Sequence, residues 1–88
     1  MKIKDGYVLR KVAENWVVLP VGKASVNLNG MLSLNESGVL LWQTLKEESD
    51  RESLVNALLS AYEVSHDEAA ADVDSFIASL VQYGCVDA

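Results

Sequence analysis

Two side chains of this 88-residue chain could form a nucleophile and its base: Cys85, the only cysteine, and His66, the only histidine. A thiol nucleophile needs its histidine within hydrogen-bond distance. The residues between them predict a helix of about 18 residues, roughly 27 Å long, which would hold the two side chains apart. No second Cys or His lies at metal-ligand spacing, and there is no Gly-rich phosphate loop. The sequence therefore predicts no catalytic residue, no metal site and no cofactor.

Carboxylates are the other reactive groups, and they are unevenly distributed. Residues 1–46 carry six basic and three acidic side chains, whereas residues 47–88 carry one basic and ten acidic side chains. Four acids, namely Asp67, Glu68, Asp72 and Asp74, fall on the expected last helix, which contains no Lys or Arg. These acids either cap the helix and form its solvent-exposed face, or they form a polar rim that meets a basic partner. Because DNA affinity depends on cationic contacts to phosphate, we expect no nucleic-acid binding.

Length and composition place these groups in one small domain. Half of the residues are apolar and 23% are charged, with a net charge of −6, which is typical of a folded domain. We expect a single domain over residues 1–88. No apolar run is long enough to span a membrane, and the first residues contain no signal-peptide core. Together with the single cysteine, these features predict a cytoplasmic protein without a membrane partner.

Strands are expected in the first half of the chain. Residues 7–12 and 16–19 are rich in β-branched and aromatic side chains, and Pro20 interrupts the second run. Asn29-Gly30 lies between two short alternating runs and predicts a two-residue hairpin over residues 25–34. In that register the last strand is apolar on both faces, which is unusual at the edge of a small domain.

Three helices are expected in the second half, near residues 36–48, 51–62 and 66–83. Asn35 is the predicted N-cap of the first, and capping boxes that start at Ser49 and Ser65 begin the other two. Gly84 suits the end of the third. The predicted core residues share helical spacing: Trp42, Leu45, Leu58, Val73, Phe76 and Leu80. A short final strand at residues 85–86 is also expected.

Strands followed by three helices predict an α+β winged helix-turn-helix domain. Its last strand, at residues 31–34, either offers unpaired backbone groups to an extended peptide or is covered by the last helix or the final strand. The residues alone leave these two interpretations open.

The sequence resembles the PqqD-like family. Leu34-Asn35-Glu36-Ser37-Gly38 and the following Leu41-Trp42-Gln43-Thr44-Leu45 are similar to its Leu-Asn-x-x-Gly-x-x-Ile-Trp-x-x-Leu core, with Leu41 in place of the usual isoleucine. The resemblance covers nearly the whole chain. The stretch 21–29 is longer than in the members that serve quinone-cofactor assembly, which favours a different modified-peptide pathway.

What the resemblance implies is a non-catalytic chaperone, also called a RiPP recognition element (RiPP denotes a ribosomally synthesised and post-translationally modified peptide). Such domains bind the leader segment of a precursor peptide by strand addition and present it to a modifying enzyme, often a radical S-adenosylmethionine protein. The implied site is the third strand and the third helix. The strand residues are Gly30, Met31, Leu32, Ser33 and Leu34.

On the third helix we expect Ala69, Val73, Phe76 and Leu80 to form a core stripe, the line of side chains that faces the core. The groove should then be lined by the positions one step around the helix from that stripe: Ala70, Asp74, Ile77 and Val81. Alternatively, Ile77 and Val81 only widen the core stripe. The competing functional interpretation is a generic winged helix-turn-helix module that binds protein or DNA in transcription.

Overall fold

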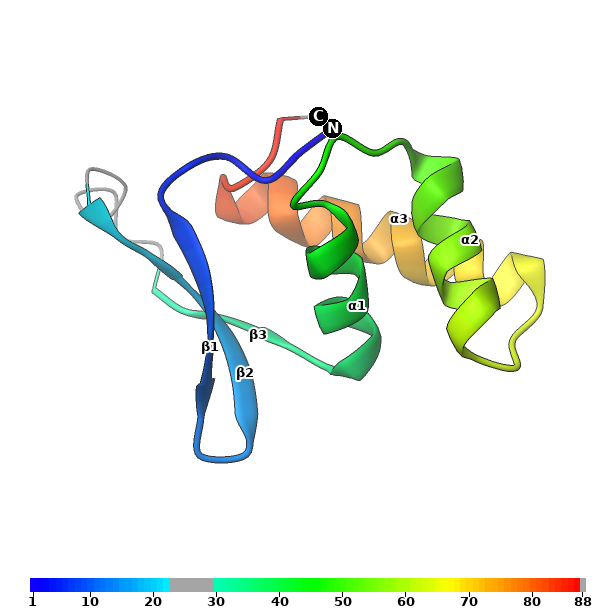
Figure 1. Cartoon of the computed structure of the whole chain (residues 1–88), viewed down its shortest axis with the longest axis horizontal. Helices are drawn as coiled ribbons and strands as arrows, with labels where there is room; N and C mark the ends of the chain where they lie inside the picture. Colours follow the sequence, from blue (N-terminus) through cyan, green and yellow to red (C-terminus); the bar gives the residue numbers. More distant parts are fainter. Residues whose placement is uncertain (23–29, 88) are drawn as a thin grey trace.

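The computed structural model describes residues 1–22 and 30–87, which form a three-stranded antiparallel sheet followed by three helices (Figure 1). In chain order the elements are β1 (Tyr7–Val12), β2 (Asn15–Pro20), β3 (Leu32–Leu34), α1 (Glu36–Thr44), α2 (Arg51–Ala61) and α3 (His66–Tyr83). The α+β class with strands before three helices is therefore confirmed. The predicted hairpin over residues 25–34 has its first strand and Asn29 outside the described residues.

Strands β1 and β2 form a hairpin that projects away from the helices (Figure 1). Tyr7 pairs with Pro20 and Val12 with Asn15, so Ala13 and Glu14 form the two-residue loop. Ala13 has a φ of 57°, a left-handed conformation that L side chains rarely adopt. The connection between these two strands is thus a tight turn.

Strand β3 lies at the edge of the sheet, because the strand order is β1-β2-β3. It pairs antiparallel with β2, with Leu32 opposite Val18 and Leu34 opposite Trp16. Leu32 and Leu34 pack against the core, while Ser33 between them is exposed. Among the described residues, no strand pairs with the outer edge of β3.

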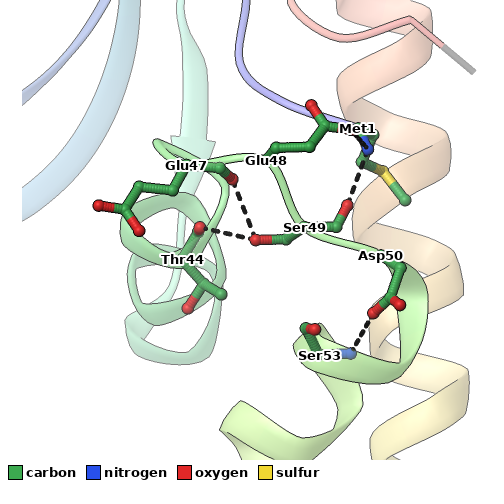
Figure 2. A network of polar contacts seen from close by, with 7 residues as sticks. All are labelled: Met1, Thr44, Glu47, Glu48, Ser49, Asp50 and Ser53. Carbon is green, nitrogen blue, oxygen red and sulfur yellow. Dashed lines mark hydrogen bonds and ion pairs between the residues drawn. The ribbon is translucent and has the colours of Figure 1, made fainter.

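Helix α1 ends at Thr44, four residues earlier than predicted, and the Ser49 hydroxyl bonds to the carbonyl of that last helical residue. The Ser49 hydroxyl lies 3.0 Å from the carbonyl oxygens of both Thr44 and Glu47 (Figure 2). The prediction that Ser49 is the N-cap of α2 is therefore wrong. That role belongs to Asp50, whose carboxylate accepts a 2.8 Å bond from the Ser53 amide (Figure 2).

Helix α3 begins and ends where the sequence predicts. The Ser65 hydroxyl accepts a bond from the Glu68 amide at 3.1 Å, and the Glu68 carboxylate accepts one from that hydroxyl at 3.2 Å. Gly84 ends the helix with a φ of 96°, a conformation suited to glycine. Both ends are therefore fixed by local chemistry.

The core lies between the sheet and the three helices. All six residues predicted to be buried are buried, and Trp42, Leu45, Val73 and Leu80 are almost completely so. Two adjacent strand residues, Val17 and Val18, are also buried. Because neighbouring side chains of a strand point to opposite faces, β2 is covered on both faces at these two residues.

The first and last described segments close the core on the helical side. Ile3 forms an isolated antiparallel bridge with Val86, so the predicted final strand is reduced to one bridge. The Met1 amine donates to the Glu48 carboxylate and the Ser49 carbonyl, at 2.7 Å each, and Figure 2 labels all three residues. No helix in the described part of the chain is long and apolar enough to cross a lipid bilayer.

Candidate functional site

A groove of about 560 Å³ lies between the outer edge of β3 and one face of α3. Strand β3 contributes all three of its residues to the lining. Helix α3 contributes Asp72, Ser75, Phe76 and Ser79, which recur at helical spacing. The groove therefore brings a strand edge that is unpaired within the described part of the chain close to a helix, which leaves room for one more extended segment.

The lining combines an apolar floor with a polar rim. Leu34, Leu41 and Phe76 provide the apolar surface, whereas Ser75 and Ser79 on α3 are exposed. Serine side chains are short, so an extended backbone can approach the helix closely. Such a groove suits a peptide strand with apolar anchors, because the edge supplies backbone bonds and the floor accepts alternate side chains.

The groove continues at both ends of β3. Toward the end of α3, a cavity of about 370 Å³ shares Leu32 and Ser79 with it and includes Met31, which is 62% exposed. Beyond the other end, a cavity of about 410 Å³ shares Asn35, Ser37 and Asp72 with it. The combined surface is longer than the three residues of β3.

Tyr83 fixes the spacing between β3 and α3. Its hydroxyl lies 2.6 Å from the Gly30 carbonyl oxygen and 3.3 Å from the Val18 carbonyl oxygen. Its ring meets the Tyr7 ring edge-on, with centroids 5.8 Å apart. Burial raises the pKa of the Tyr83 phenol. Sequence reasoning missed this residue, although its spacing from Phe76 and Leu80 places it on the core stripe.

The strand half of the predicted site lies in this groove. Residues 31–34 line its cavities. Gly30 does not line them, but its carbonyl accepts the bond from Tyr83.

The helix half of the predicted site lies elsewhere. Among the described residues, none of Ala70, Asp74, Ile77 and Val81 lines the three cavities of the groove. Ala70 and Ile77 are half-buried against the core, so the alternative interpretation, a widened core stripe, holds for Ile77. Val81 is exposed.

Asp74 shows why this flank of α3 lies away from the groove. Its carboxylate accepts two bonds from the Arg51 guanidinium of α2, at 2.7 and 3.0 Å. Arg51 thereby lowers the pKa of that carboxyl group. The flank with Asp74 therefore faces α2, and the flank with Asp72 faces β3.

The two candidate reactive side chains are not brought together. His66 is exposed, with its Nε2 4.0 Å from a Glu52 carboxylate oxygen. Cys85 is fully buried, its thiol donates to the Leu80 carbonyl at 3.7 Å, and burial raises the pKa of the thiol to about 11. Such a thiol is protonated and inert near neutral pH. Within residues 1–22 and 30–87, no cluster of His, Cys, Asp or Glu could hold a metal ion.

Comparisons with known proteins identify the class to which this fold and groove belong. Residues 15–86 match the family described as "Coenzyme PQQ synthesis protein D (PqqD)". Because the match covers most of the chain, the protein belongs to the PqqD family, as the sequence motif indicated. The search of curated proteins found no match.

Two solved structures share the fold over nearly their full length. One is "TbiB1 in Complex with the TbiA(beta) Leader Peptide", with a TM-score of 0.76, 23% sequence identity and coverage of 99% of this chain and 95% of that chain. The other is "Lasso peptide synthetase B1 complexed with the leader peptide", with a TM-score of 0.71, 20% identity and coverage of 94% and 92%. At these identities the likeness establishes the fold alone.

Proposed function

We propose that this protein is a non-catalytic chaperone that binds the leader segment of a ribosomally made precursor peptide as an additional strand on β3. The observation that carries the proposal is the outer edge of β3, which lines a groove against α3 and pairs with no strand among residues 1–22 and 30–87. The proposal is supported by two solved proteins of the same fold whose titles name a bound leader peptide.

The expected affinity is moderate. A segment paired with residues 30–34 would form about four or five backbone hydrogen bonds, each worth roughly 0.5–1.5 kcal/mol net. Two or three buried aliphatic side chains would add about 1.5–3 kcal/mol each. Ordering a flexible peptide costs several kcal/mol. The net of about −8 kcal/mol corresponds to a micromolar dissociation constant.

We further propose that the bound peptide is presented to a modifying enzyme in the cytoplasm, and that this enzyme is a radical S-adenosylmethionine protein. The family resemblance supports a modifying partner, and the buried cysteine fits a reducing compartment. Co-expression with the enzymes encoded beside the gene tests the class of partner. Retention of a peptide-synthetase component, and of no radical enzyme, would contradict this choice.

Binding can be tested with synthetic peptides that cover the short open reading frames next to the gene. Ser79 lines the middle of the groove and is exposed, so Ser79→Arg should block binding without disturbing the core. Ala78 is an exposed neighbour outside the groove lining, so Ala78→Arg is the matched control and should bind normally. Equal binding of both variants would place the site elsewhere.

Strand addition has a second, independent signature in the peptide. In a paired strand, successive amides point in opposite directions, so only every second one bonds to β3. Methylating the backbone nitrogens one at a time should therefore weaken binding at alternate positions only. A uniform effect, or none, would argue against pairing with the strand.

A further inference from the structure

The groove extends past the last residue of β3 into the cavity of about 410 Å³. Three of its lining residues are apolar or aromatic: Leu58, Tyr62 and Val64, which come from the end of α2 and the connection to α3. This cavity lies where a strand paired with β3 would run on beyond its paired residues, because it shares Asn35, Ser37 and Asp72 with the main cavity. A peptide that fills the groove would therefore place a flanking residue there.

Two carboxylates lie at this cavity, and no basic side chain of the described residues neutralises either of them. Glu36 and Asp72 are both exposed, and neither forms an ion pair with any residue that the structure describes. Asp74, two residues further along α3, is instead paired with Arg51. None of the described residues that line the three cavities is a Lys, Arg or His.

We propose that this cavity binds a Lys or Arg side chain of the leader peptide, next to the segment that pairs with β3. The inference rests on the proposed function and adds a determinant of specificity to it. An apolar wall beside two exposed carboxylates suits a side chain with a long aliphatic stem and a cationic head. The exposed ring of Tyr62 adds a face on which a cation can lie.

The electrostatics of α1 are compatible with a cation there. The first turn of a helix carries a partial positive charge, which would oppose a cation at this point. Glu36 lies in that first turn and offsets the partial charge, which leaves the Asp72 carboxylate to attract the cation.

The experiment uses a display library of random dodecapeptides as the probe, selected against the full chain. Selections are run in parallel on the wild type, on Asp72→Asn, on Glu36→Gln and on the control Asp74→Asn. The control removes the same charge from the same helix, but on the flank that faces α2. All three changes alter exposed side chains, and circular dichroism checks that each variant is folded.

We expect wild-type binders to share aliphatic anchors and a Lys or Arg at one fixed offset from them. The basic preference should persist with Asp74→Asn and weaken with Asp72→Asn and Glu36→Gln. For one selected peptide, replacing its basic residue by Gln should reduce affinity about 3- to 5-fold in the wild type, the range of a partly exposed ion pair, and by less in Asp72→Asn.

The outcomes separate this inference from the function on which it rests. Binders with aliphatic anchors but no basic preference, or with an aromatic residue at that offset, would overturn the cationic site and leave peptide binding intact. The same loss of preference with Asp74→Asn would overturn it too. A selection that enriches no peptide would overturn both proposals.

The side on which the basic residue falls also reports the orientation of the bound strand. A peptide antiparallel to β3 would carry the basic residue on the N-terminal side of its anchors, and a parallel peptide on the C-terminal side.

Discussion

The Tyr83 hydroxyl donates a 2.6 Å hydrogen bond to the Gly30 carbonyl oxygen, which joins the last turn of α3 to the residue before Met31 and β3. This bond spans 53 residues of sequence and lies at one end of the groove. It holds the strand edge and the helix at a set distance, which the proposed peptide must match.

Replacing Tyr83 by Phe should weaken both folding and peptide binding. The loss of the hydroxyl removes the bond to the Gly30 carbonyl, which should cost about 0.5–1.5 kcal/mol of unfolding free energy because that carbonyl belongs to an exposed residue. Peptide affinity should fall as well, because the spacing of the groove is less firmly fixed. Urea unfolding and calorimetry measure the two effects. Tyr62→Phe removes an exposed hydroxyl and is the control for stability, and equal stability of the two variants would contradict the role of the Tyr83 bond.

Truncation of Trp42 should have the larger effect on stability. Trp42 is 1% exposed at the centre of the core, so Trp42→Ala leaves a cavity and should cost about 3–5 kcal/mol. Trp16 is half-buried at the hairpin, with the Lys11 ammonium 5.8 Å from its ring, so Trp16→Ala should cost less than half as much. An unchanged melting temperature for Trp42→Ala would contradict the core assignment.

The β1–β2 turn offers a change that should stabilise the protein. Ala13 holds a φ of 57°, which glycine adopts without a steric penalty. Ala13→Gly should raise the unfolding free energy by about 0.5–1 kcal/mol, because relief of strain exceeds the added chain entropy. Glu14, the other loop residue, has no positive φ, so Glu14→Gly should lower stability slightly. Identical shifts in the two urea midpoints would argue against strain at Ala13.

Stability should fall in alkaline solution because of Cys85. Burial raises the pKa of its thiol to about 11 from an ordinary value of 9.0, so the folded state retains a proton that the unfolded state releases. The contribution of the protonated thiol to the unfolding free energy is complete below pH 9. It is lost as the pH rises toward 11, by at most about 1.4 kcal/mol per pH unit. Unfolding free energies of the wild type and Cys85→Ala across this range test the point. Burial shifts the pKa of Tyr83 in the same direction, so the variant should keep a smaller dependence.

The acidic α3 predicts that the protein does not bind DNA. The helix contains four carboxylates and no Lys or Arg, so it repels the phosphate backbone. A labelled random duplex should not be retained by micromolar protein at physiological salt. Salt-sensitive retention would favour the transcription-related alternative.

The sequence by itself determined the features that depend on local chemistry. The Ser65 capping box and Gly84 set the ends of α3, and helical spacing predicted the core residues, because these signals lie within one turn of the helix. Ser49 was harder to assign, since a serine can cap the helix that follows or bond the carbonyls of the helix before, and here it does the latter.

Only the tertiary structure decided which flank of α3 faces β3. Each flank of the core stripe carries one acid, Asp72 on one side and Asp74 on the other, and helical spacing alone gives no reason to place either of them beside β3. The packing of α2 against α3 places Arg51 beside Asp74, which leaves Asp72 at the groove. The contact of Tyr83 with Gly30 has the same origin. Helical periodicity identifies the buried stripe of a helix, but the direction from which each neighbour approaches that helix depends on residues far away in the chain.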